Sequence, residues 1–159
     1  MDFAAAVRYA LGMNTQVLKA YVGDLSDAEL LERPGPGCNP IAFQLGHLIT
    51  SGGELLNGVE PGAAPALPAG FAEQHASPDL PQGGRTKAEY LQLLDQLDGA
   101  VLALVDRLPA AAFDAPSPER MQSYAPTKGA VVLLIATHGL MHAGQFVPVR
   151  RRLGKPVVI

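Results

Sequence analysis

Hydrophobic residues recur at spacings of three and four along four long stretches of the chain, a pattern typical of amphipathic helices that bury one face. The first predicted helix spans residues 2–22 and ends near Gly23. The second begins with Asn39 as its N-cap and Pro40 in the first helical position, where a missing N–H costs nothing. Its apolar stripe ends before Pro61.

The third predicted helix begins with a capping box, in which the side chains of Thr86 and Glu89 satisfy the first free backbone N–H groups. Its apolar positions continue to the edge of Pro109. The fourth helix takes Thr127 as its N-cap and runs to Leu153, where a glycine and a proline follow as a stop signal. These four segments predict an all-α protein.

The stretch 60–85 is rich in proline, glycine and alanine and has no sustained periodicity. It could be a disordered linker between two domains, or a crossover connection inside one helical bundle. Neither side of it holds enough residues for a second core, so we expect one domain, 1–159, built as a four-helix bundle. The long crossover would then join the second and third helices.

Composition narrows the function classes. The chain is 48% hydrophobic and 17% charged with a formal net charge of −3, which favours a globular protein and disfavours a nucleic-acid binder with a basic surface. Its single cysteine, Cys38, cannot form an internal disulfide, which suits the cytoplasm. No basic signal region precedes Val7, and the apolar run 129–137 is too short to cross a bilayer. We therefore expect a cytoplasmic protein with neither a membrane nor a nucleic-acid partner.

Candidate chemistry lies in the histidines. His138 and His142 are four residues apart, so on a helix they share one face, and that face is the predicted inward stripe. Buried imidazoles need hydrogen bonds or a metal to offset their lost hydration. His47, at the edge of the second helix's apolar stripe, offers a third ligand. Three protein ligands would leave coordination positions open for water or substrate. The competing interpretation is a pair of hydrogen-bonded core histidines, or one turned to solvent.

Several polar residues could support such a site. Gln145 shares the inward stripe and could orient a substrate or water as a catalytic residue, or it could be a buried amide that bridges helices. Metal-bound imidazoles usually donate their second N–H to a polar partner, and candidates for that role are Tyr21, Asn14 and Glu54. His75, in the long crossover, is interpreted as a surface residue.

Other motifs are missing or open to two interpretations. Gly139 follows the first histidine of the pair, whereas metalloproteases of the His-Glu-x-x-His type place glutamate there. Neither a phosphate-binding glycine loop nor a Gly-x-Ser-x-Gly turn is present. Basic side chains cluster at the end of the fourth helix, where they complement the helix dipole or bind an anionic substrate: Arg150, Arg151, Arg152 and Lys155.

Three stretches of this sequence resemble the DinB/YfiT-like superfamily of bacterial helical-bundle proteins: residues 37–48, 137–145 and 150–156. The resemblance implies a bundle with up-down-down-up topology and a long crossover between the second and third helices. It also implies a divalent-metal site at His47, His138 and His142, and a homodimer. Three imidazoles suit zinc, nickel, copper or iron, and we expect zinc or nickel.

The resemblance also implies an activity. Related proteins are metal-dependent transferases or isomerases that act on small molecules with a low-molecular-weight thiol such as bacillithiol, mycothiol or glutathione. Metal-assisted hydrolysis is an alternative, with Glu54 as a candidate general base. A non-enzymatic module that holds a metal or small ligand is a third. Dependence on added thiol separates the first two hypotheses, and a closed coordination sphere would favour the third.

Overall fold

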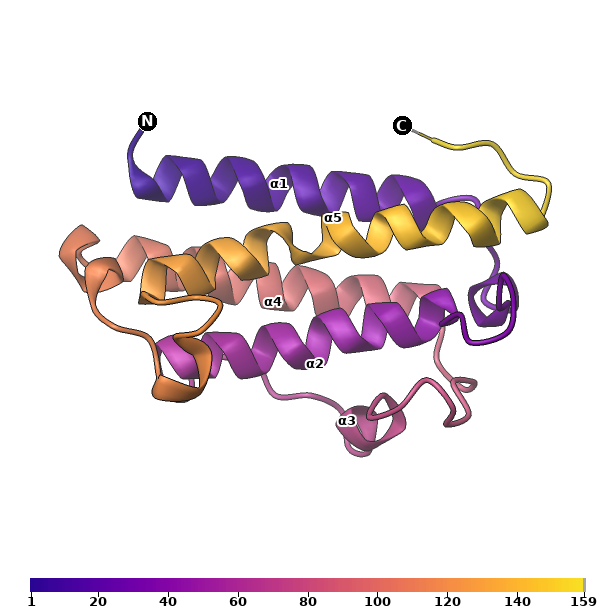
Figure 1. Cartoon of the computed structure of the whole chain (residues 1–159), viewed down its shortest axis with the longest axis horizontal. Helices are drawn as coiled ribbons and strands as arrows, with labels where there is room; N and C mark the ends of the chain where they lie inside the picture. The colour runs from indigo at the N-terminus through magenta and orange to yellow at the C-terminus, as the bar shows by residue number, and fades with distance from the viewer. Residues whose placement is uncertain (159) are drawn as a thin grey trace.

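A computed structural model describes residues 1–158, and within them the chain is all-α, as predicted. Four long helices lie side by side: α1 (Phe3–Val22), α2 (Ile41–Val59), α4 (Lys87–Arg107) and α5 (Lys128–Arg152) (Figure 1). The connections contain short helical turns: η1 (Glu29–Leu31), α3 (Phe71–Gln74), η2 (Ala110–Asp114) and η3 (Glu119–Met121). The described residues contain an isolated bridge between Pro116 and Thr127 but no β-strand.

Three of the long helices begin with side-chain caps. The Asp2 carboxylate accepts a hydrogen bond from the backbone N–H of Ala5 at 2.8 Å. Thr86 and Glu89 form the predicted capping box at the start of α4. Thr127 accepts from the third backbone N–H of α5 at 3.1 Å. Because a cap depends on a few neighbouring residues, the sequence locates these boundaries well.

The start of α2 differs from the prediction. Pro40 is the N-cap in an extended conformation (φ −68°, ψ 155°), and no side chain caps the helix. Asn39 therefore lies one residue outside the position expected for it. Its carbonyl oxygen instead accepts a hydrogen bond at 3.1 Å from Nε2 of Gln44, a buried residue of the first turn. This contact fixes the direction of the Gln44 amide.

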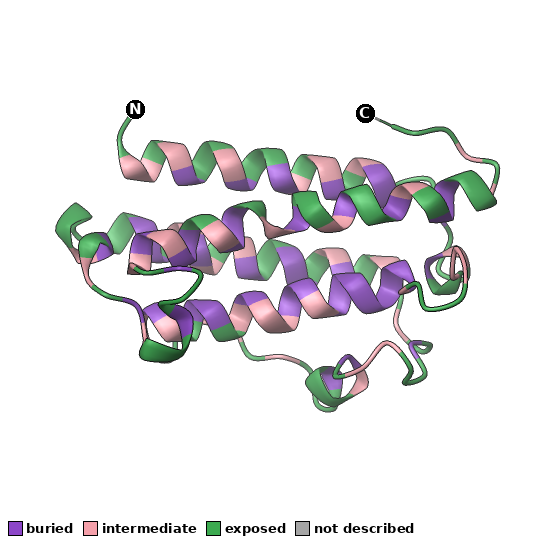
Figure 2. Cartoon of the chain, in the orientation of Figure 1, coloured by how far each residue is buried: buried purple, intermediate pink, exposed green. Residues whose placement is uncertain are grey.

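Each long helix packs against two others: α5 contacts α1 and α2, and α4 contacts the same two helices. The chain direction in Figure 1 shows α1 and α5 running one way and α2 and α4 the other. Buried residues follow the inward stripes of all four helices (Figure 2).

The buried apolar residues form two clusters rather than one continuous core. On α5, one cluster ends at Ala136 and the other resumes at Ala143. On α1, the corresponding gap lies between Leu11 and Leu18. Polar side chains can therefore face the interior at mid-length without interrupting apolar packing at either end.

The crossover between α2 and α4 is anchored by a buried cluster, which corrects the interpretation of His75 as a surface residue. His75 is only 3% exposed. Its Nδ1 lies 2.8 Å from the Phe71 carbonyl oxygen and its Nε2 lies 2.9 Å from the Tyr90 hydroxyl. Gly46 of α2 makes room for the ring, because a Cβ there would lie 2.0 Å from His75 Cδ2. Phe71 is a local partner, but Tyr90 and Gly46 lie on the long helices, so local polarity did not predict the burial.

The C-terminal end of α5 is held by an internal ion pair. Arg150 is 1% exposed and donates to both carboxylate oxygens of Asp24, at 2.6 and 3.1 Å, and to the Tyr21 carbonyl. The Arg150 side chain lowers the pKa of Asp24 through its hydrogen bond. The guanidinium therefore ties α5 to the end of α1 and is not available to an anionic substrate.

Helix α5 also changes one sequence-based expectation. Among the helices of residues 1–158, α5 alone is long and apolar enough to cross a membrane, judged by length and composition. Its mean hydropathy is 1.5 over an 18-residue window. The short apolar run 129–137 therefore understates the apolar length of the helix that contains it. The same test is passed by core helices of soluble proteins, and α5 packs against α1 and α2, so the finding is weak evidence for insertion.

Candidate metal centre

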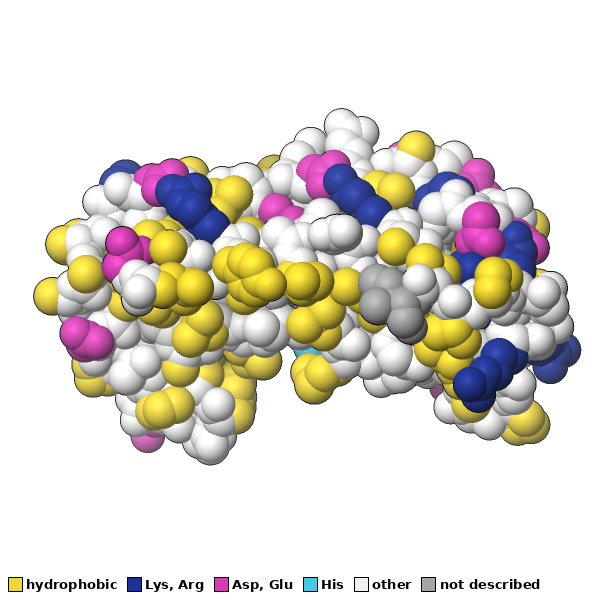
Figure 3. Space-filling view, turned by 90° about the horizontal axis from the view of Figure 1, so that it is seen from above, with side chains coloured by type: hydrophobic (Ala, Val, Ile, Leu, Met, Phe, Trp, Pro, Cys, Tyr) yellow, Lys and Arg dark blue, Asp and Glu magenta, His cyan; other side chains and the backbone are white. Residues whose placement is uncertain are grey.

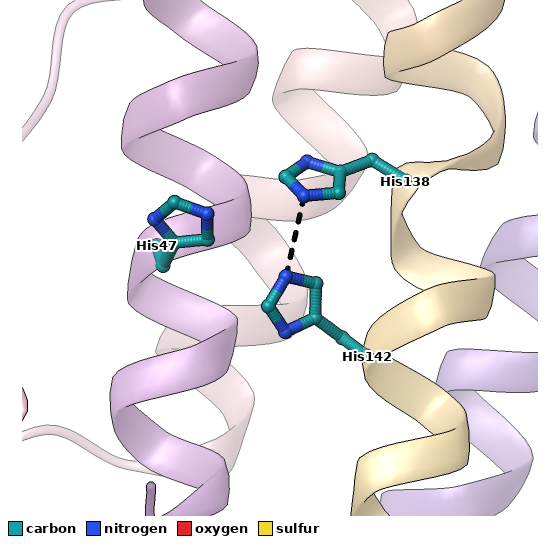
Figure 4. Close-up of side chains that lie close together, drawn as sticks. All are labelled: His47, His138 and His142. Atoms are coloured by element: carbon teal, nitrogen blue, oxygen red, sulfur yellow. Dashed lines mark hydrogen bonds between the residues drawn. The ribbon is translucent and has the colours of Figure 1, made fainter.

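Three histidines from two helices converge, and the two on α5 lie in the gap between the core clusters of that helix. His47 comes from α2, and His138 and His142 come from successive turns of α5 (Figure 4). One nitrogen of each ring can be chosen so that the three atoms all lie within 4.8 Å of one another. The His47 ring centroid lies 5.4 Å from that of His138 and 5.3 Å from that of His142. The structure thus brings the three predicted ligands together.

The α5 pair already has a spacing that suits a shared metal ion. The two Nε2 atoms of His138 and His142 are 3.3 Å apart. Two imidazole nitrogens bound tetrahedrally to zinc, each at about 2.0–2.1 Å, would be separated by about 3.3 Å. The donor set and its spacing fit one divalent ion.

Gln44 orients His142, and the sequence did not identify this role. Its Oε1 lies 3.0 Å from Nδ1 of His142, while its Nε2 donates to the Asn39 carbonyl. Because the amide nitrogen faces a carbonyl acceptor, the amide oxygen must accept from the imidazole. His142 then carries its proton on Nδ1, and the lone pair of Nε2 faces His138 and the metal position. This is the usual outer-shell arrangement of a metal-bound histidine.

The residues expected to surround the imidazoles have different roles. The backbone carbonyl of Tyr21 accepts from Arg150. Asn14 lies in the interior layer, and its Oδ1 has no hydrogen-bond partner among the described residues. Glu54 is exposed, and its charge partly offsets the lowering of the His47 pKa. Glu54 thus acts on a candidate ligand through its charge, and Asn14 lines an interior pocket together with His138.

Burial favours the neutral form of all three ligands. It is the main cause that lowers the pKa of His47 and of His138. Burial together with the two neighbouring imidazoles lowers the pKa of His142 to about 4. Neutral imidazoles have a free lone pair near pH 7, so a metal ion would displace few protons on binding.

Gln145 does not lie on the buried stripe, contrary to expectation. It is exposed and lines a pocket with Cys38, Gln44 and Pro148. Pro148 and the loop before α2 lie on this side of α5, so the helix turns Gln145 toward them and away from the interior. Its catalytic role stays a prediction, and its position is next to the Gln44 side chain that orients His142.

The histidine site can be reached from one side of the molecule. Figure 3 shows the protein hollowed along one edge between two lobes, with a histidine side chain visible at the hollow. The three ligand residues are each partly exposed. On α2, the ring of Phe43 stacks beside that of His47 at a centroid distance of 6.2 Å and shields it on one side.

An all-α protein with three converging, neutral histidines is a candidate metalloprotein. The model of the DinB superfamily matches residues 10–146, and the chain belongs to this superfamily. The match includes all three histidines, Gln44 and Gln145, whereas the stretch 150–156 lies beyond it. Members of this superfamily generally bind metal, which agrees with the three-histidine group. A search of curated proteins finds no match.

Proposed function

We propose that this protein is a metal-dependent transferase that uses a low-molecular-weight thiol as co-substrate and acts on a small electrophilic molecule. The observation that carries the proposal is the convergence of His47, His138 and His142 within 4.8 Å at a partly exposed position. Three imidazoles leave coordination positions free for a substrate atom, unlike a closed structural site. Zinc and nickel are the ions proposed for the site.

The residues of the chain prepare the site in two ways. Gln44 fixes His142 with its Nε2 lone pair toward the metal position, and burial keeps the imidazoles unprotonated. A bound divalent ion would supply Lewis acidity, which lowers the pKa of a thiol at the site. The sulfur of the deprotonated thiol then forms a bond to the electrophilic carbon, the leaving group departs with the bonding electron pair, and the thiol proton passes to solvent. Gln145 is proposed to contact the substrate.

Other parts of the proposal extend the same interpretation. Residues 1–159 form one domain with the up-down-down-up topology of a four-helix bundle, supported by the helix directions in Figure 1. We propose a cytoplasmic protein with no nucleic-acid or membrane partner, which acts as a homodimer. Exposed apolar side chains on α1 and α5 support the dimer: Tyr9, Met13, Leu133 and Met141.

A thiol-consumption assay tests the activity. Tag-free protein loaded with zinc or nickel is mixed with 1-chloro-2,4-dinitrobenzene and, in turn, with bacillithiol, mycothiol and glutathione. We expect one thiol to be consumed faster than in the uncatalysed reaction, only with metal, and not by the His138→Ala variant. Folded His75→Gln protein is the histidine control and should retain the activity. Metal-loaded protein that consumes none of the three thiols would contradict the transferase proposal.

Metal-assisted hydrolysis is the second candidate, favoured by the Glu54 carboxylate, whose charge raises the pKa of His47 against the effect of burial. A carboxylate near a metal ligand could act as general base for water. Hydrolysis of a small ester by the metal-loaded protein, without any thiol and with a loss in Glu54→Gln, would support this candidate. A protein that binds metal but shows neither activity would instead support a non-enzymatic binding module.

A further inference from the structure

The pocket beside Gln145 adjoins the histidine site through Gln44, which lines the pocket and contacts His142. Its volume is about 280 Å³, and three segments form its walls. The first turn of α2 contributes Gln44, and α5 contributes Gln145 and Pro148. The loop before α2 contributes Pro34, Gly37, Cys38 and Asn39. None of the metal ligands lines it.

The lining of this pocket is uncharged, and its amide residues are set among a larger area of apolar atoms. Three side-chain amides line it, and within the described part of the chain no charged residue does. The nearest cation in the loop sequence, Arg33, donates instead to the backbone carbonyl of Cys38 at 2.9 Å and to that of Pro78. Arg33 thus holds the loop against the crossover and leaves the pocket without a counter-ion for an anion.

The pocket is coupled to the metal centre through a single side chain. Gln44 lines the pocket and also accepts the hydrogen bond from Nδ1 of His142 at 3.0 Å. Gln145 follows His142 by three residues on the same helix, so both reach from neighbouring turns of α5. A small molecule that extends from the hollow at the histidines past Gln44 would enter this pocket.

We propose that this pocket binds the part of the substrate or co-substrate remote from its reacting atom, and that this part is uncharged and carries amide or hydroxyl groups. Gln44 already uses its amide on Asn39 and His142. The amides of Asn39 and Gln145 would therefore donate to and accept from such groups. An ionised carboxylate would lose hydration there without a cation to compensate. Pro148 adds an apolar wall. The inference rests on the proposed function for the identity of its ligand, but not for the existence of the pocket.

Two matched probes test the proposal without thiol chemistry or oxidation of Cys38. N-acetyl-L-serinamide is neutral, and N-acetyl-L-serine differs from it by an ionised carboxylate. Each is titrated into nitrogen-15-labelled protein, metal-free and zinc-loaded, while the side-chain amide signals of Asn39, Gln44 and Gln145 are followed. We expect the neutral probe to shift these signals and to bind at least about tenfold more tightly than the anion.

Two variants test whether the neutral probe binds in this pocket. Gln145→Leu should weaken the neutral probe by about five- to tenfold, because one hydrogen-bonding side chain is lost. Gln16→Leu, the same change at an exposed position of α1, should have no effect. An anion that binds as well as the neutral probe, or a Gln145→Leu protein that binds normally, would overturn the proposal.

The same titration separates this inference from the proposed function. His138→Ala removes a metal ligand that does not line the pocket, so the variant should bind the neutral probe as the wild type does. Probe binding with no thiol-dependent activity would support the pocket and reject the transferase. Thiol-dependent activity with no probe binding would reject only the pocket.

Discussion

The four histidines occupy two environments that differ in how their ring nitrogens are satisfied. His75 is fully enclosed, and its two nitrogens meet the Phe71 carbonyl and the Tyr90 hydroxyl. His138 and His142 are only partly buried, and their Nε2 atoms face each other at 3.3 Å. Both ring nitrogens of His75 meet oxygen atoms, whereas His138 and His142 share a hydrogen bond between two ring nitrogens.

This difference shows how a structural histidine can be told from a ligand. Burial alone does not decide, because His75 is the most buried of the four and is the one outside the candidate metal centre. What distinguishes the candidate ligands is that nitrogen atoms of three rings lie within 4.8 Å of one another, and that the Nε2 atoms of His138 and His142 are hydrogen-bonded to each other. A metal ion is the partner that three converging lone pairs can share.

The largest expected effect is the loss of metal binding in His138→Ala. Wild-type protein reconstituted with zinc should hold about one ion per chain, and the variant should hold almost none, because two imidazoles cannot complete the site. Elemental analysis of tag-free protein measures this. Since His138 is partly exposed, the metal-free variant should fold normally by circular dichroism. Wild-type protein that stays metal-free after zinc and nickel reconstitution would contradict the metal centre.

His75→Ala should show the opposite behaviour, with metal retained and stability lost. The change leaves a cavity and removes the partner of two buried polar groups, so we expect a loss of roughly 3 kcal/mol in the free energy of unfolding. Urea unfolding of metal-free protein measures it. Tyr90→Phe is the matched control, and it removes one hydrogen bond with little volume change, for about 1 kcal/mol. If His75→Ala instead emptied the metal site, the two environments would not be separate.

Gln44→Leu should weaken metal binding without abolishing it. The variant keeps all three ligands but removes the acceptor that holds His142 in its metal-binding tautomer, and such changes typically cost about 10- to 100-fold in metal affinity. Competition with a zinc chelator measures the affinity. Gln44→Glu restores an acceptor for Nδ1 and should recover much of the loss. Equal affinities in wild type and Gln44→Leu would mean that the Gln44 contact has no influence on the metal.

The sequence was sufficient for features that depend on neighbouring residues. The caps at Thr86 and Thr127 each involve residues within one turn, and the helical periodicity of α1 and α2 repeats over many residues. The His138–His142 pair is also local, because a helix fixes the relation of residues four apart.

Features that depend on distant partners could not be predicted in the same way. Gln44 meets His142 across 98 positions of the chain, and nothing in its local sequence marks that contact. His75 is buried because Gly46 leaves space for its ring, and the space exists only once the crossover folds onto α2. Helical periodicity predicts Gln145 on the inward stripe, but the residue is exposed. Periodicity does not reveal which neighbour covers each side of a helix.

The smallest expected effect is a difference in the pH dependence of stability, and it concerns His75 alone. Burial lowers the pKa of His75 below its ordinary value of 6.5, partly offset by its bond to Phe71 and reinforced by Arg85. A histidine whose folded pKa is lowered contributes stability that is complete above pH 6.5 and is lost as the pH falls toward the folded pKa. Removing it in His75→Gln should reduce the acid slope of the unfolding free energy by up to about 1.4 kcal/mol per pH unit. Chelator-treated protein is needed, because protonation of the three ligands also releases metal. Urea unfolding between pH 5 and 7 measures both slopes, and identical slopes would show that His75 is protonated as easily in the folded chain as in the unfolded one.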